Sequence, residues 1–248
     1  PGKTLGRAFY QRRNKMTGLS GTSLRKWIVM AGLVTLSSTA PAQQGNWDST
    51  YRPDIYHVQV DLFRAAKHSK KDIVFLGNSI TFWGNWSELL QKKHIKNRGI
   101  PGDITFGVLN RLDEIIKGKP RKVFILIGIN DIARNIPDSV ILRNCRRIIQ
   151  AIKMASPRTK IFFQSILPVN PSFGKTKAHY KQDRIRNVNA GLKQLTAEEQ
   201  VGFIDLYAAF ADAGGNLPAH FSFDGLHLVK AGYDRWAGIL REGGYLKK

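Results

Sequence analysis

Short apolar runs alternate with amphipathic stretches along most of the chain, an arrangement typical of an α/β fold. The unbroken run 73–76 (Ile-Val-Phe-Leu) suits a strand that is buried on both faces of a parallel sheet. Four further runs predict strands, and apolar residues at helical spacing predict helices between them. The predicted strands are 73–76, 94–97, 123–127, 160–167 and 201–205, and the predicted helices lie within 56–66, 108–116, 141–152, 185–195 and 229–240.

Five strands that alternate with helices predict one parallel sheet with right-handed crossovers, covered on both faces in a three-layer α/β/α fold. The chain has 248 residues, which is enough for one well-buried domain of this kind. It contains no internal repeat and no low-complexity segment. We therefore expect a single domain over 43–248, with a flexible lead-in and the first helix in 43–70 and the sheet in 71–248.

The upstream residues 1–42 have a different character. A basic pair, Arg25 and Lys26, precedes a ten-residue apolar run at 27–36, and small residues follow at 40–42. This order predicts a signal peptide, and the apolar run is too short to cross a bilayer. We expect a protein exported to a periplasm or beyond, with no transmembrane span in its mature form. An uncleaved apolar tail is the alternative.

Composition narrows the choice of partners. Hydrophobic content of 42% and charged content of 23% are those of a soluble globular protein, but the net charge is +21. Without residues 1–42 the chain keeps 32 basic and 18 acidic residues, or +14. This surplus could attract polyanions, yet no nucleic-acid-binding motif is present, so we expect a basic, solvated surface and no nucleic-acid partner. The lone Cys145 excludes an internal disulfide and a cysteine-based metal site.

The first candidate for a catalytic residue stands where the first apolar run ends, in Gly77-Asn78-Ser79. Ligands of open α/β sheets bind at the carboxyl ends of the strands. A serine that starts a helix there has an exposed hydroxyl and an unpaired backbone N–H. Ser79 therefore offers both a nucleophile and an oxyanion donor. A serine that merely caps a helix is the alternative.

Three later loops carry possible partners for this serine. In the loop after the second strand, Asp103 could cap the next helix and leave the Gly102 N–H free to donate. Asn130 follows the third strand and could aim its amide at the same place. Near the carboxyl terminus, Asp224 precedes His227 by three residues and can accept its Nδ1 proton, which leaves Nε2 as a base. Each feature alone also fits a turn or a buried structural pair.

Taken in order, these four features resemble the SGNH (GDSL-type) hydrolase family over roughly residues 50–245. The resemblance implies a flavodoxin-like fold and an acyl-transfer enzyme. It implies that Ser79 is the nucleophile, His227 the general base and then acid, and Asp224 the residue that orients it. The implied oxyanion hole consists of the N–H groups of Ser79 and Gly102 and the side chain of Asn130. No metal and no organic cofactor is needed.

The chain departs from the family's name motif, since Gly77-Asn78-Ser79-Ile80 stands where that motif reads Gly-Asp-Ser-Leu. The serine is kept, so the chemistry is not in doubt, but the local hydrogen bonding is expected to differ. An α/β-hydrolase is the rival fold. Its G-x-S-x-G elbow requires glycine where Thr81 stands, and its acid and histidine normally come from separate loops.

Candidates for substrate binding are Trp83, just after the nucleophile, and Asn170, at the start of a long loop that also holds His179. Packing of Trp83 against the sheet and an ordinary surface loop are the alternatives. Exported family members of this appearance resemble sialate or other carbohydrate O-acetylesterases and platelet-activating-factor acetylhydrolase-like proteins. We therefore expect hydrolysis of a short-chain, acetyl ester on a glycan or small molecule. The alternatives are a lysophospholipase or general acyl esterase and, in another class, a non-catalytic protein that binds a polyanion or glycan.

Overall fold

The computed structural model describes residues 47–247, and its five strands form one parallel sheet in the order β2-β1-β3-β4-β5. This is the flavodoxin-like order, in which β1 lies between β2 and β3. The expected α/β/α fold with a central five-stranded parallel sheet is confirmed. The strands are β1 (Ile73–Gly77), β2 (Ile95–Gly99), β3 (Lys122–Leu126), β4 (Lys160–Gln164) and β5 (Gly202–Ile204).

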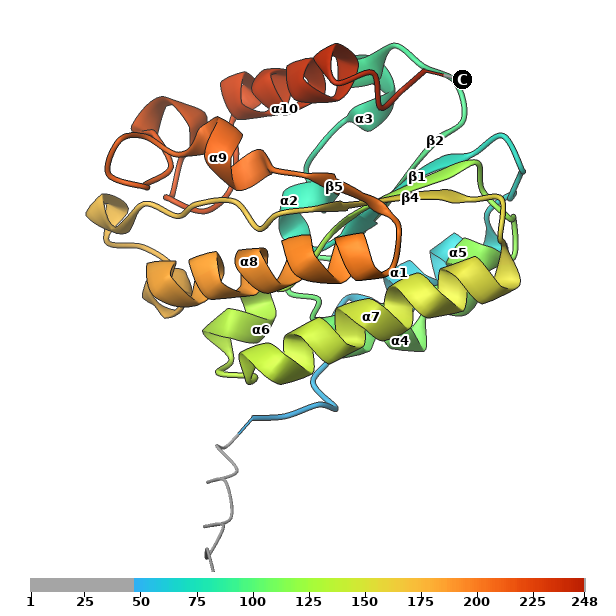
Figure 1. Cartoon of the computed structure of the whole chain (residues 1–248), viewed down its shortest axis with the longest axis horizontal. Helices are drawn as coiled ribbons and strands as arrows, with labels where there is room; N and C mark the ends of the chain where they lie inside the picture. The colour runs from blue at the N-terminus through green and yellow to red at the C-terminus, as the bar shows by residue number, and fades with distance from the viewer. Residues whose placement is uncertain (1–46, 248) are drawn as a thin grey trace, which may run out of the picture. The chain divides into compact units, whose positions relative to one another are not determined.

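Helices cover both faces of the sheet (Figure 1). Helices α3 and α10 pack together on one face, and α7 contacts α4, α5 and α8 in the layer on the other. The helices are α1 (Tyr56–Ala65), α2 (Ser79–Phe82), α3 (Trp86–Leu90), α4 (Thr105–Asn110), α5 (Leu112–Ile116), α6 (Ile129–Ala133), α7 (Asp138–Ala155), α8 (Gln182–Glu198), α9 (Leu206–Phe210) and α10 (Lys230–Glu242), with 3-10 turns at Pro171–Phe173, Lys177–His179 and Ala219–Phe221.

Strand β4 ends three residues earlier than its apolar run predicts. Its ladder with β5 stops at Gln164, which pairs with Ile204. Beyond that point the backbone of Ile166 is bound by a helix instead. The Asn189 side chain of α8 accepts the Ile166 N–H at 2.8 Å and donates to the Ile166 carbonyl at 2.9 Å. The apolar residues that follow remain buried but lie outside the sheet.

The predicted helix over 108–116 is in fact two helices, α4 and α5, separated at Arg111. The Arg111 side chain is 0% exposed and donates to the carbonyl oxygens of Gly77 and Arg98 and to the Asp103 carboxylate. A single straight helix was the simpler interpretation of the apolar spacing. The buried guanidinium instead links the helix pair to the ends of β1 and β2.

The core lies between the sheet and the helices. Helix α7 turns Ile141, Cys145, Ile148 and Ile152 inward, and all four are fully buried, as the apolar stripe predicts. Burial raises the pKa of the Cys145 thiol well above its ordinary value, so this residue behaves as a small apolar side chain. On the other face, the buried Trp86 ring stacks on a strand residue and packs edge-on against α10.

Part of the predicted flexible lead-in is packed. Trp47 stacks on Phe106 with ring centroids 5.8 Å apart, and Arg134 lies over the Tyr51 ring. The predicted signal peptide falls on residues outside those that the structure describes, and it stays a prediction. Within residues 47–247, no helix is both long enough and apolar enough to cross a membrane.

Candidate active site

Ser79 is the first residue of α2, just after β1, which lies between β2 and β3. The turn requires Gly77, because a Cβ there would lie 2.4 Å from the Leu126 carbonyl oxygen. Asn78 caps the helix, and its Oδ1 accepts the Ile80 N–H at 3.0 Å. Since Asn78 performs the capping, the Ser79 hydroxyl is available for other contacts. The Asn78 Nδ2 is buried and has no hydrogen-bond partner among the described residues.

The Ser79 hydroxyl lies 2.9 Å from His227 Nε2, although 148 positions separate the two residues in the chain. On the other side of the ring, His227 Nδ1 lies 2.6 Å from Asp224 Oδ2. The structure therefore brings together the three side chains that the sequence singles out. An imidazole held in this way can accept a proton from the hydroxyl while the carboxylate fixes its tautomer.

A tight turn holds the aspartate in place. The second oxygen of Asp224 accepts the N–H groups of Leu226 at 2.9 Å and His227 at 2.7 Å. Ser222 Oγ donates to the His227 carbonyl at 2.7 Å and closes the turn. Burial alone would raise the pKa of Asp224, but the hydrogen bonds from His227 and Leu226 outweigh it and hold this pKa below its ordinary value. The carboxylate is thus ionised where histidine is neutral.

Gly102 and Asn130 flank Ser79 because β2 and β3 flank β1. Gly102 has a φ of +80°, and a Cβ there would crowd Pro53, at 3.2 Å. Among the described residues, the Gly102 and Ser79 N–H groups donate to no protein acceptor. Asn130 Nδ2 donates to the Asp103 carbonyl at 2.9 Å, so the amide reaches across β1 to the residue after Gly102. Its second N–H hydrogen remains for another acceptor.

The helix after Gly102 is capped from another part of the chain. Helix α4 begins at Thr105, and the Asp131 carboxylate accepts both the Thr105 N–H at 3.0 Å and its hydroxyl at 2.6 Å. The expectation that Asp103 caps this helix is wrong, because Arg111 occupies one oxygen of that carboxylate and the adjacent Ile104 N–H occupies the other. Asp131 thereby links the segment that carries Asn130 to the loop that carries Gly102.

His179 is a contact of the site whose role the sequence does not reveal. Its Nε2 lies 3.2 Å from Asn130 Oδ1, and its Nδ1 lies 3.2 Å from the Thr176 carbonyl. Burial lowers the pKa of His179, so the ring is neutral and carries one N–H. With that proton on Nε2, His179 donates to the Asn130 amide oxygen, while the Asn130 amide nitrogen donates to the Asp103 carbonyl.

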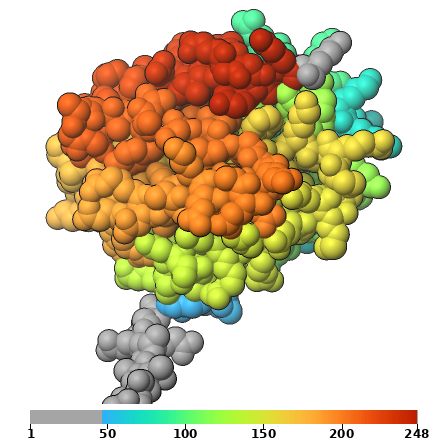
Figure 2. All heavy atoms as spheres, viewed as in Figure 1, coloured from blue at the N-terminus to red at the C-terminus, as the bar shows by residue number. Residues whose placement is uncertain are grey.

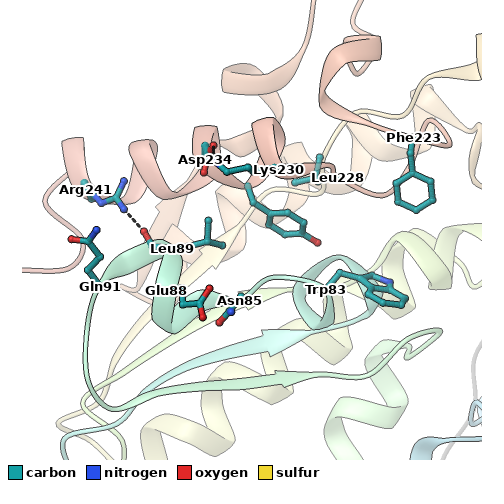
Figure 3. Close-up of a pocket in the computed structure, with 11 residues that line it drawn as sticks. Trp83, Asn85, Glu88, Leu89, Gln91, Phe223, Leu228, Lys230, Asp234 and Arg241 are labelled. Carbon is teal, nitrogen blue, oxygen red and sulfur yellow. Dashed lines mark hydrogen bonds and ion pairs between the residues drawn. The ribbon is translucent and has the colours of Figure 1, made fainter.

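A groove of about 740 Å³ lies between α3 and α10 (Figure 3). Trp83 and Phe223 form one end, and Gln91 and Arg241 lie at the other. The Phe223 ring stacks on His227 with centroids 5.8 Å apart, and it is 57% exposed. Trp83 is 61% exposed, so packing against the sheet is the wrong interpretation for this residue.

Asn170 does not lie in a position to bind substrate. Its side chain is 9% exposed, donates to the Leu217 carbonyl at 2.7 Å and accepts the Ser172 N–H and hydroxyl. Its backbone N–H donates to the Gly225 carbonyl at 2.8 Å. The polar atoms of Asn170 are therefore used to join the loop after β4 to the turn that holds Asp224. We correct its role from substrate binding to support of that turn.

A flavodoxin-like sheet whose loops bring this set of side chains together defines a carboxylic ester hydrolase of the SGNH type. Residues 75–235 match the GDSL-like Lipase/Acylhydrolase family. The chain belongs to this family, as the resemblance in its sequence predicts.

Named relatives agree with this assignment. The chain is 29% identical over 188 residues to the alpha2 subunit of platelet-activating factor acetylhydrolase IB from Homo sapiens, which covers 71% of this chain and 77% of the relative. A solved structure of a proposed platelet activating factor from Streptococcus pneumonia is 33% identical, with a TM-score of 0.70 over 76% of this chain and 90% of that one. A catalytic mutant of Axe2, an acetylxylan esterase from Geobacillus stearothermophilus, shares the fold at 22% identity, with a TM-score of 0.57 over 72% and 96%.

Proposed function

We propose that the protein is a serine esterase that removes short acyl groups, acetyl above all, from carbohydrate substrates. The observation that carries the proposal is the continuous chain of contacts from Asp224 through His227 to Ser79, at 2.6 Å and 2.9 Å. These are hydrogen-bond distances between an orienting acid, a base and a nucleophile. A protein that only binds a glycan or polyanion has no use for this arrangement together with free N–H donors.

In the proposed reaction, His227 Nε2 takes the proton of the Ser79 hydroxyl as the oxygen attacks the ester carbonyl. The N–H groups of Ser79 and Gly102 and the free Asn130 N–H stabilise the resulting oxyanion. His227 then gives its proton to the leaving alcohol, and an acyl-enzyme remains on Ser79. Water attacks this ester with His227 again as base, and the carboxylic acid leaves as the serine regains its proton.

The acetyl preference is supported by the similarity to an acetylhydrolase subunit at 29% identity. The carbohydrate preference is supported by the groove beside the site. Two exposed aromatic rings, Trp83 and Phe223, can stack on sugar rings, and the polar side chains of Asn85, Glu88 and Gln91 line the same groove. An acetylated oligosaccharide placed there would present an ester to Ser79 at the groove's aromatic end.

A long acyl chain is the second candidate occupant. The observation that favours it is the apolar lining of the groove, to which Leu89, Leu228 and the Tyr233 ring contribute (Figure 3). A lysophospholipase or general acyl esterase would place its fatty chain along these residues. The two candidates predict different substrates for the same serine, so one panel of substrates separates them.

The first experiment tests the nucleophile with p-nitrophenyl acetate. Ser79→Ala should abolish turnover, whereas Ser139→Ala, which changes an exposed serine of α7, should leave it unaltered. Turnover that survives Ser79→Ala would remove this serine from the mechanism. A wild-type protein with no turnover of any ester would favour the non-catalytic binder.

The second experiment identifies the substrate by measuring acid release from acetylated xylan, acetylated monosaccharides, O-acetylated sialic acids and lysophospholipids. We expect release from the acetylated carbohydrates. Trp83→Ala and Phe223→Ala should each raise KM for the polymeric substrate while turnover of p-nitrophenyl acetate changes little. Cleavage of lysophospholipids alone would overturn the carbohydrate proposal. Export is part of the same proposal, and amino-terminal sequencing of the mature protein checks it.

A further inference from the structure

A cavity of about 510 Å³ lies at the opposite end of the sheet from Ser79. The loops that lead into β1, β3 and β4 meet there, at the amino ends of the strands (Figure 1). We call this cavity the basic pocket. Its lining residues are Lys70, Lys119, Pro120, Arg121, Ser156, Pro157 and Arg158.

Four of the seven lining residues are cationic and none is acidic. Across residues 47–247, Lys70, Lys119, Arg121 and Arg158 form no salt bridge. The Nε atom of Arg121 is also buried and, within the same residues, has no hydrogen-bond partner. Buried donors in native proteins nearly always have an acceptor, so this one requires an explanation. A bound oxyanion would supply both the acceptor and the missing negative charge.

More positive charge surrounds the pocket. Burial lowers the pKa of Lys122, and the charges of Arg121, Lys160 and Lys92 lower it further. The adjacent carboxylate is that of Asp72, whose backbone carbonyl accepts the Arg121 N–H. One oxygen of this carboxylate accepts the Ser69 N–H at 2.9 Å. Figure 2 shows cyan, green and yellow parts of the chain gathered along this edge of the molecule.

We propose that the basic pocket binds the carboxylate groups of an acidic polysaccharide. No aromatic residue lines it, so it lacks the platform on which single-stranded nucleic acid stacks its bases. Its only apolar lining residues are Pro120 and Pro157, so it has no large apolar side chain to insert into a membrane. The choice of a polysaccharide rests on the proposed function, because a long polymer held here can also reach the esterase site at the other end of the sheet.

The geometry permits one polymer to use both sites. The strands of five residues separate the two ends of the sheet by about 16 Å, and a polymer must span more than this because it passes over the helices that cover the sheet. A polymer bound by its carboxylates at the basic pocket would raise the effective concentration of its acetyl esters near Ser79. The pocket thus serves as an anchor and takes no part in the acyl transfer.

The test measures binding of polygalacturonate to the whole protein by titration calorimetry, with neutral dextran as the uncharged control. The variant combines Lys119→Gln, Arg121→Gln and Arg158→Gln. A matched variant removes the same charge from three exposed, scattered positions and combines Arg143→Gln, Lys193→Gln and Arg235→Gln. Turnover of p-nitrophenyl acetate, measured on every sample, reports the esterase site independently.

We expect polygalacturonate, but not dextran, to bind, and the pocket variant to lose at least about tenfold in affinity while the matched variant loses less than about threefold. Turnover of p-nitrophenyl acetate should be the same in all three proteins. Equal losses in both variants, or equal binding of dextran, would overturn the proposal. Binding of duplex DNA or phosphatidylserine vesicles without polygalacturonate would refute the polysaccharide as the ligand. Failure of the esterase assay alone would leave the binding result intact.

Discussion

Replacing Asp224 by asparagine tests the proposed mechanism at the residue that never touches substrate. Only an oxygen can accept the Leu226 and His227 N–H groups, so in Asp224→Asn the amide oxygen must take the place of Oδ1. The amide nitrogen then faces His227 Nδ1. Two donors cannot share that contact, so the imidazole must carry its proton on Nε2, which points at the Ser79 hydroxyl. A ring protonated there cannot take the serine proton.

The expected loss in kcat/KM is about 10⁴-fold, the cost of the same replacement in a comparable triad, or about 5 kcal/mol of transition-state stabilisation. The turn should survive, because the amide oxygen preserves both backbone hydrogen bonds. The assay is p-nitrophenyl acetate hydrolysis together with urea denaturation. Asp205→Asn is the matched control, since Asp205 caps α9 through Ala208 away from the site, and it should keep kcat/KM within about twofold.

A folded Asp224→Asn variant that retains more than a tenth of wild-type kcat/KM would refute this reasoning. The pH dependence of stability supplies a second check. The pKa of Asp224 is lowered in the folded protein, so its ionised form contributes stability above the ordinary carboxyl pKa of 3.8. This contribution is lost as the pH falls through the folded-state value. The stability difference between the wild type and the variant should therefore shrink below about pH 4.

Three further predictions concern the donors and their supports. Asn130→Ala should lower kcat by about 10²–10³-fold with little change in KM, because the amide acts on the developing oxyanion. His179→Ala should lower kcat by about tenfold, and His179→Gln should restore most of that loss. Steady-state kinetics measure both effects. Burial raises the pKa of Asp131 from 3.8 to about 7, so its contribution to stability is full below pH 4 and declines as the pH rises toward 7. Urea denaturation at pH 5 and pH 8 should show a smaller stability change for Asp131→Asn than for the wild type, and an equal change would contradict the assignment.

The sheet can be predicted from the sequence because its strands are buried on both faces and stand out as apolar runs. The predicted boundaries of helices and strands are wrong where a side chain from a distant element binds the backbone. Asn189 binds the backbone of Ile166 and ends β4 early, and Arg111 divides the predicted helix over 108–116. Neither event leaves a periodic signal, since each depends on one polar residue reaching across the fold.

The candidate site likewise has residues that can be predicted from the sequence and contacts that cannot. Ser79 is visible in the sequence because it follows a buried strand directly, and Asp224 and His227 are visible because they stand three residues apart just before the last helix. The orientation of the Asn130 amide is not visible, because it depends on the Asp103 carbonyl on one side and His179 on the other. Asn170 misled the prediction for a related reason. A polar residue in a loop over the site resembles a ligand contact until its own hydrogen bonds are known.

The position of the loop that carries Gly102 depends on Arg111, which belongs to none of the four sequence motifs. The Arg111 guanidinium joins the Gly77 carbonyl, two residues before the serine, to the Asp103 carboxylate, next to Gly102. It also contacts Glu114, which pairs with Arg98 at 2.9 Å. A buried network of this kind is weak evidence for added stability, because desolvation of its charges offsets most of their attraction. Its physical effect here is to fix the ends of β1 and β2 relative to each other, and with them the N–H groups of Ser79 and Gly102 that we propose as oxyanion donors.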